Sequence, residues 1–85
     1  MKQFKNKVVK VMLQNNNIKY YDVHVFLNRK DEFSVYVEVD HNTIDESGES
    51  IIQYCVDKGL ITSEEANMVS YVEEVSKDVY SNFNK

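Results

Sequence analysis

The chain has 85 residues, of which 42% are hydrophobic and 12% aromatic, so it can build one modest core and is too apolar for a disordered segment. Its single cysteine, Cys55, excludes a disulfide framework and fits a reducing compartment. No apolar run reaches the length of a membrane-spanning helix and no signal-peptide pattern follows the first lysines, so we expect one domain, residues 1–85, in the cytoplasm.

The net charge of −4 is unevenly distributed along the chain. Residues 1–30 contain seven lysine or arginine residues and one acid, whereas residues 31–85 contain three lysines and thirteen acids. This division predicts either two electrostatic faces or two halves that neutralise each other after folding. Lysine outnumbers arginine nine to one, asparagine is frequent and proline is absent, which is typical of an AT-rich genome such as that of a low-GC bacterium or its phage.

The first segment, residues 2–14, fits two kinds of structure. On a helical wheel Phe4, Val8, Val11 and Met12 share one arc and the lysines lie away from it, which is typical of an amphipathic helix. Three valines within four positions favour a strand instead. We predict a helix that ends at the three asparagines that follow, and the strand remains the alternative.

Residues 20–40 predict an antiparallel β-hairpin, because apolar and polar side chains alternate with a period of two in both halves. Pairing residues whose numbers have the same sum places Leu27 opposite Phe33 and Tyr21 opposite Val39, with every apolar side chain on one face. The predicted loop, about residues 29–31, lacks the glycine that such turns favour.

The second half of the chain predicts a polar connection and two helices. Residues 40–50 are polar, and residues 51–58 then form a short helix with Ser47 or Ser50 as its N-cap, Gly59 at its end and Cys55 packed in the core. The pattern Thr62-Ser63-Glu64-Glu65 is a capping box, from which we predict a helix of about twenty residues. Its apolar stripe is formed by Met68, Val69, Val72, Val75, Val79 and Phe83.

These elements predict a small α+β domain with the order α-β-β-α-α, in which an antiparallel hairpin has helices packed on one face. A lone hairpin is marginally stable in water, so the helices must cover its apolar face. The polar face is then left toward solvent.

Catalytic and metal-binding patterns are missing from the sequence. The chain has two glycines and no phosphate-binding loop, nucleophile motif or metalloprotease helix. His24 among Asp22, Glu38 and Asp40 has the chemistry of a general base or a metal ligand, but simple alternation on a solvated strand accounts for the same residues. We therefore predict a protein that is not an enzyme and that has no metal, cofactor or small-molecule substrate.

The basic first third of the chain suggests nucleic-acid binding as one hypothesis. Its lysines could contact phosphates, and exposed aromatic rings of the hairpin could stack on unpaired bases. The acids on the same face of the hairpin would repel phosphate. The residues of this alternative site are Lys2, Lys5, Lys7, Lys10 and Lys19, to which Arg29 and Lys30 could add.

The polar face of the hairpin suggests protein binding as the preferred hypothesis, because large aromatic residues surrounded by charges are typical of an interface. The candidate residues are Tyr20, Asp22, His24, Phe26, Tyr36, Glu38 and Asp40. The partner would be another protein or a second copy of the chain. Together with the composition, this predicts a phage or mobile-element protein that binds and modulates a host factor. A small nucleic-acid-associated regulator is the alternative.

Overall fold

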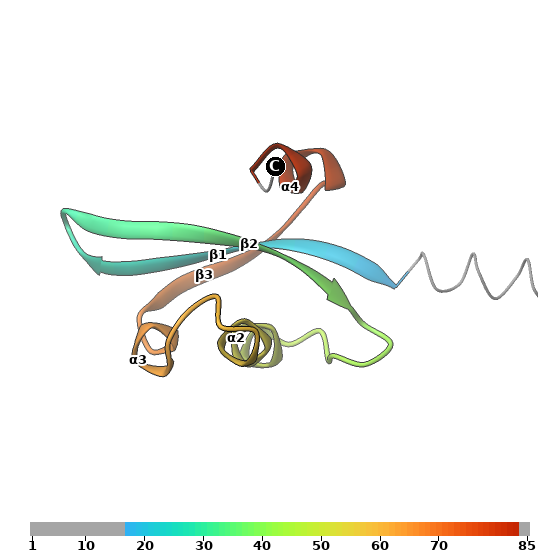
Figure 1. The fold of residues 1–85 in the computed structure, drawn as a ribbon, viewed down its shortest axis with the longest axis horizontal. Coiled ribbons are helices and arrows are strands. Elements are labelled where there is room, and N and C mark those ends of the chain that lie inside the picture. Colours follow the sequence, from blue (N-terminus) through green and yellow to red (C-terminus); the bar gives the residue numbers. More distant parts are fainter. Residues whose placement is uncertain (1–16, 84–85) are drawn as a thin grey trace, which may run out of the picture.

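The computed structural model describes residues 17–83, which form a three-stranded antiparallel sheet and three helices. The elements follow the order β1 (Ile18–Asn28), β2 (Asp31–Asp40), α2 (Gly48–Asp57), α3 (Ser63–Ala66), β3 (Val69–Val75) and α4 (Lys77–Phe83). The strand order in the sheet is β2-β1-β3, so the first strand is central (Figure 1). The α+β class is confirmed, but the predicted order α-β-β-α-α is wrong, because β3 lies in the segment predicted as one long helix. The predicted first helix, residues 2–14, lies outside the described residues.

The β1–β2 hairpin forms as predicted, with a register that differs by two residues. Tyr21 lies opposite Val37, and Val25 lies opposite Phe33. A shift of two residues leaves every side chain on its predicted face, because the side-chain period of a strand is also two. The predicted apolar face is therefore correct even though the predicted partners are not.

The tip of the hairpin explains the shift in register. Leu27 is an extra residue between the pairs that Phe26 and Asn28 form with β2, so β1 is bulged just before the turn. The Oδ1 atom of Asn28 accepts a hydrogen bond from the Lys30 N–H at 2.9 Å. This side-chain contact stabilises the turn without glycine.

The helix of about twenty residues predicted from Thr62 is wrong beyond its first turn. The capping box is present, since the Thr62 hydroxyl accepts from the Glu65 N–H and the Glu65 carboxylate accepts from the Thr62 N–H. The helix that it caps, α3, ends at Ala66, and the chain then pairs with β1 as β3.

A β-bulge in β3 accounts for the helix-like spacing of Val69 and Val72. Val69 pairs with Val25 and Tyr71 pairs with His24, which leaves Ser70 as an extra residue. Val69 and Val72 therefore lie on the same face of the sheet although they are three positions apart. A spacing of three is typical of a helix, and here it results from the inserted residue.

The core lies on one face of the sheet, under α2 and α3, while α4 lies over the other face (Figure 1). The prediction placed all helices on one face, which differs from this arrangement. The buried core side chains are Tyr21, Val23, Val25, Val37, Val39, Ile51, Cys55 and Ile61. None of the helices described in residues 17–83 has the length and hydropathy that a membrane span requires.

Helix α2 begins at Gly48, three residues before the predicted start. Its N-cap is Ser47, one of the two predicted caps, whose side chain accepts a hydrogen bond from the Ser50 N–H at 3.2 Å. The helix ends at Asp57, with Lys58 as its C-cap. Gly59 follows in a left-handed backbone conformation, with φ of 77°, which favours glycine. Cys55 is fully buried, as predicted.

The polar connection after β2 is held by one histidine. The Nδ1 atom of His41 lies 2.7 Å from the Ile44 carbonyl oxygen, and its Nε2 atom lies 2.7 Å from the Tyr21 hydroxyl. A carbonyl only accepts hydrogen bonds, so Nδ1 carries the proton, and in the neutral ring Nε2 accepts from Tyr21. This bridge joins the connection to the core face of β1.

Candidate functional site

The seven residues predicted to bind a partner are all even-numbered residues of β1 and β2, and they share the sheet face opposite the core, here called the outer face. Their cross-strand neighbours on β3 are Tyr71, Glu73 and Val75. The structure separates the seven residues into a part covered by α4, a polar cluster at the centre of the sheet, residues at the β2 edge, and Phe26 toward the hairpin tip.

Helix α4 covers two of the predicted aromatic residues. The ring of Tyr20 lies 4.8 Å from that of Tyr80, centroid to centroid, and Tyr36 stacks on Phe83 at 4.7 Å with planes 6° apart. These contacts are attractive offset aromatic pairs. Tyr20 and Tyr36 therefore bury part of their surface within the chain. This contact was not predicted, because the residues of α4 were predicted as the end of one long helix from Thr62, packed on the core face of the hairpin.

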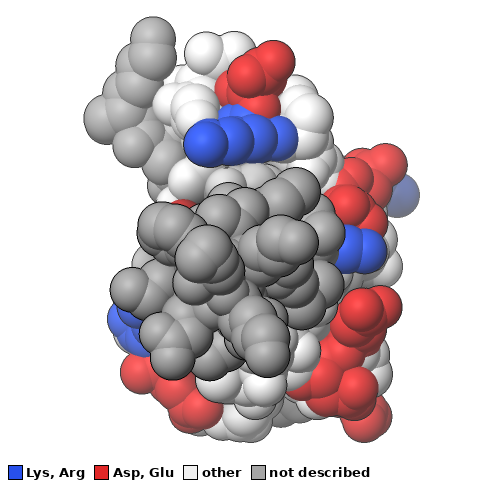
Figure 2. All heavy atoms as spheres, turned by 90° about the vertical axis from the view of Figure 1, so that its right-hand side faces the viewer, with Lys and Arg blue, Asp and Glu red and all other residues white. Residues whose placement is uncertain are grey.

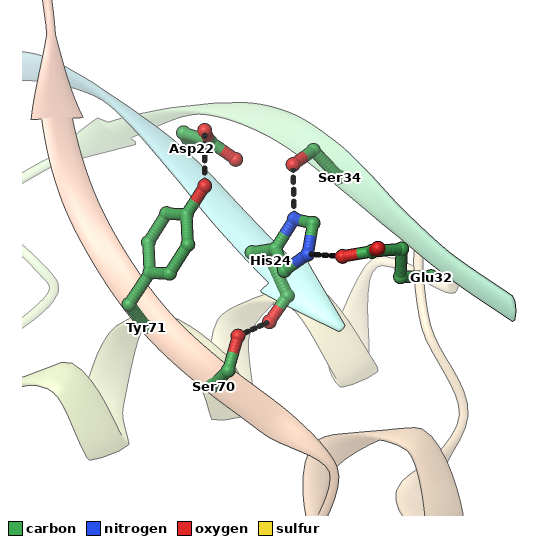
Figure 3. A network of polar contacts seen from close by, with 6 residues as sticks. All are labelled: Asp22, His24, Glu32, Ser34, Ser70 and Tyr71. Carbon is green, nitrogen blue, oxygen red and sulfur yellow. Dashed lines mark hydrogen bonds and ion pairs between the residues drawn. The ribbon is translucent and has the colours of Figure 1, made fainter. Parts of the chain in front are cut away.

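The side chain of His24 is held by its neighbours on both sides (Figure 3). Its Nε2 atom lies 2.7 Å from Glu32 Oε1, and its Nδ1 atom lies 2.9 Å from Ser34 Oγ. The imidazole is parallel to the ring of Tyr71, with centroids 5.0 Å apart and planes 4° apart. Because a carboxylate only accepts hydrogen bonds, Nε2 donates to Glu32. The ring is 19% exposed and has one defined orientation.

Asp22 is buried at the centre of the outer face, with only 8% of its surface exposed. It lies between Tyr36 on β2 and Glu73 on β3. The Tyr71 hydroxyl donates to Asp22 Oδ2 at 3.4 Å (Figure 3). Among the described residues, Oδ1 has no hydrogen-bond partner. Asp22 was predicted to bind a partner, but in the structure it is enclosed by its neighbours.

The Asp22 carboxylate affects the two tyrosines beside it. Desolvation, followed by the negative charge of Asp22, raises the pKa of both Tyr36 and Tyr71 above the ordinary value for tyrosine. Glu73 acts in the same direction on both groups. Both hydroxyls therefore stay protonated and can donate hydrogen bonds well above neutral pH.

The uncovered part of the outer face lies toward the hairpin tip. Phe26 is 43% exposed and Tyr71 is 45% exposed, on neighbouring strands and on either side of His24. With the exposed Glu32, these four residues are called the tip patch. Tyr71 was not among the predicted site residues, because β3 was predicted as part of a helix. The β-branched residues around Tyr71 favour a strand.

Glu38 and Asp40 belong to a different surface. They line a groove of about 400 Å³ that also contains Tyr54 and Leu60, from the region of α2. Asp40 additionally stabilises the turn after β2, because its Oδ1 atom accepts from the Asn42 N–H at 2.9 Å. These two predicted residues are therefore separate from the tip patch.

The residues predicted for nucleic-acid binding are only partly described. Lys2, Lys5, Lys7 and Lys10 lie outside the described residues. Lys19 lies 3.8 Å from Glu74, an exposed pair that contributes little to stability. Figure 2 shows lysine and arginine side chains scattered among acidic ones, without a continuous basic area among the described atoms of that face.

Within residues 17–83, no group of three or more His, Cys, Asp or Glu side chains is arranged to hold a metal ion. Comparison of the chain with protein-family models, with curated protein sequences and with solved structures finds no match.

Proposed function

We propose that the chain is a protein-binding module without catalytic activity, and that the tip patch contacts the partner. The observation that carries this proposal is the exposure of Phe26 and Tyr71 around a histidine whose orientation is already set. Aromatic side chains on a rigid sheet lose little conformational entropy on binding and often provide most of the binding free energy. The hydrogen bonds of His24 further preorganise the patch.

The charges around the tip patch favour a partner with a basic surface. Glu32 is part of the patch, and Glu73 is exposed on β3, next to Tyr71 on the same face. Such an acidic rim steers a basic partner and disfavours an acidic one. With the composition of the chain, this supports a phage or mobile-element protein that modulates a host factor in the cytoplasm. The partner is another protein or a second copy of the chain.

The geometry of His24 supports a binding role over catalysis. Both ring nitrogens already have partners, Glu32 and Ser34, so a substrate would have to displace one of them to exchange a proton. The ring lies on the open face of a sheet and not in an enclosed cavity that could exclude water.

Substitution of the patch aromatics tests the proposal. We would pull down partners of the tagged chain from host lysate with nuclease, at about 150 and 500 mM salt, and measure self-association by sedimentation. Phe26→Ser and Tyr71→Ser should each abolish partner capture or self-association while circular dichroism stays unchanged. Phe83→Ser is the matched control, since Phe83 is 66% exposed and lies outside the patch.

Two outcomes would contradict the proposal. If both patch variants fold and bind as well as the parent chain, another surface makes the contact. If no protein is captured and the chain remains monomeric, but nucleic acid is recovered when nuclease is omitted, the alternative of a nucleic-acid-associated regulator using Lys2, Lys5, Lys7, Lys10 and Lys19 replaces it. Binding of that kind weakens steeply as salt rises.

A further inference from the structure

The outer edge of β2 is a second feature of the sheet with the properties of a binding surface. Within residues 17–83 no strand pairs with this edge, since β2 is the outermost strand. At the edge of β1 that faces β3, the Phe26 N–H donates to the carbonyl of Met68, the residue just before β3, at 3.0 Å. Backbone groups of successive residues point to opposite edges of a strand, so even-numbered residues of β1 bond to β3 and odd-numbered ones bond to β2.

This alternation identifies the backbone groups at the outer edge. Val37 lies opposite an odd-numbered residue of β1, so its N–H and C=O point to β1. Just past the strand, the His41 N–H donates to the Asn17 carbonyl at 2.8 Å, in agreement with this direction. The N–H and C=O groups of Tyr36 and Glu38 therefore point outward, where an added strand can pair with them.

The same edge forms the floor of a groove between helices on opposite faces of the sheet. Tyr54, Lys58 and Leu60, at and just after α2, line one side, and Tyr80 of α4 lines the other. The groove has a volume of about 400 Å³. A strand that paired with β2 would therefore have side-chain contacts on both of its faces.

The two sides of the groove select different side chains. On the outer face, the residues of β2 in the groove include Glu38 and Asp40, so an incoming side chain on that face lies beside carboxylates. On the core face the groove presents Tyr54 and Leu60. The ammonium group of Lys58 lies 5.6 Å from the centre of the Tyr54 ring, also on this side. An added strand with alternating basic and apolar residues matches both sides.

A second copy of the chain matches this edge poorly. Strand β2 contains four acids, Asp31, Glu32, Glu38 and Asp40, and no basic residue. Antiparallel pairing of two β2 strands over nearly their full length places Glu32 opposite either Glu38 or Asp40 on the same face. Like charges directly opposite each other destabilise a sheet. Charge complementarity therefore favours a basic peptide over self-pairing.

We propose that the outer edge of β2 binds an extended segment of another protein as an added strand, with lysine or arginine facing Glu38 and Asp40 and apolar residues facing Tyr54 and Leu60. This site is separate from the tip patch and does not depend on it. Main-chain hydrogen bonds provide affinity in such complexes, and alternate side chains provide specificity.

The probe is a short labelled peptide of alternating lysine and valine, whose binding to the full chain is measured by fluorescence polarisation. The control peptide alternates glutamate and valine. The decisive variant is Glu38→Pro, which removes an outward N–H and one carboxylate and leaves the hydrogen bonds to β1 in place. Its matched control is Glu74→Pro, which removes the same charge and an outward N–H from the opposite edge of the sheet. Glu74 lies opposite Tyr21, an odd-numbered residue whose backbone groups bond to β2, so the Glu74 N–H points away from β1.

We expect the lysine peptide to bind and the glutamate peptide not to bind. Glu38→Pro should weaken binding by about tenfold, as the loss of one hydrogen bond and one ion pair predicts, and Glu74→Pro should change it by less than about twofold. Equal weakening by the two variants would show attraction to net charge alone and would overturn the proposal, as would no binding of the lysine peptide. If Glu38→Pro fails to fold, Glu38→Lys and Glu74→Lys replace the pair, with the same expected difference.

Discussion

Asp22 on β1 and Glu73 on β3 lie directly opposite each other on the outer face of the sheet. Two carboxylates in this relationship repel each other, and the Asp22 carboxylate is also nearly removed from water. The central strand thus contains a group that opposes folding at the position where the polar cluster is densest.

Asn substitution of this aspartate should stabilise the protein. Asp22→Asn removes the charge and keeps an oxygen that can accept from Tyr71, so we expect the free energy of unfolding to increase by about 1 kcal/mol near neutral pH. Urea denaturation measures the change. Glu73→Gln, which neutralises the other carboxylate of the pair, is the control and should also increase the free energy of unfolding. In the double variant the increase should be smaller than the sum of the two single increases. A loss of stability in Asp22→Asn would show that the charge has a favourable partner.

Removal of the Tyr71 hydroxyl should have the opposite effect. Tyr71→Phe keeps the ring parallel to His24 but removes the hydrogen bond from Tyr71 to Asp22, so the free energy of unfolding should fall by about 1 kcal/mol. In the Asp22→Asn background the loss should be smaller, because an unpaired amide costs less to bury than a carboxylate. Equal losses in the two backgrounds would show that the charge of Asp22 does not strengthen this hydrogen bond, and no loss in either background would show that the bond contributes nothing.

The His41 bridge predicts a specific protonation pattern. The Ile44 carbonyl requires a proton on Nδ1, so nitrogen NMR at neutral pH should show the Nδ1–H tautomer. Tyr21→Phe removes the donor to Nε2 and should lower the free energy of unfolding by about 1 kcal/mol, with little change in circular dichroism. Detection of the Nε2–H tautomer in the parent chain would contradict the assignment.

Alkaline pH should destabilise the fold through Cys55. Burial raises the pKa of this thiol from 9.0 to about 11. Between these values the folded chain keeps a proton that the unfolded chain has released, so the free energy of unfolding falls as pH rises through this range. Tyr21, Tyr36 and Tyr71 have raised pKa values and act in the same direction.

Denaturation of Cys55→Ala across the same pH range provides the control. The variant should be less stable at neutral pH because of the small cavity, but its stability should depend less steeply on pH above 9. In the parent chain, thiol reagents should react slowly below that pH, since Cys55 is fully buried. Equal pH slopes in both proteins would assign the alkaline transition to the tyrosines alone.

The alternation in residues 20–40 predicted the hairpin and its two faces, because the period of a strand determines which side chains share a face. It could not determine the register, since a shift of two residues preserves that pattern. The difference came from the bulge at Leu27 and the side-chain contact of Asn28 at the turn. Local turn chemistry, and not hydrophobic pattern, selected the partners.

Strand β3 could not be recognised from periodicity, because the extra residue Ser70 puts Val69 and Val72 on one face with a spacing of three. The β-branched content of this segment was the contrary signal. The error also affected the candidate site, because Tyr71 belongs to β3. In addition, β3 places α4 on the outer face, where it contacts Tyr20 and Tyr36. The outer-face residues of β1 and β2 could be predicted from the alternation of each strand. Which of them α4 covers depends on contacts between segments that are distant in the sequence.

The central position of the first strand has a consequence for how the chain folds. One neighbour of β1 follows immediately through a tight turn, whereas contacts with the other join residues about 50 positions apart, as between Asp22 and Tyr71, which are separated by 49. The hairpin can form early, but the second pairing must first close a long loop at an entropic cost. During synthesis one edge of β1 stays unpaired until β3 has emerged, so we expect the docking of β3 to be slower than the formation of the hairpin.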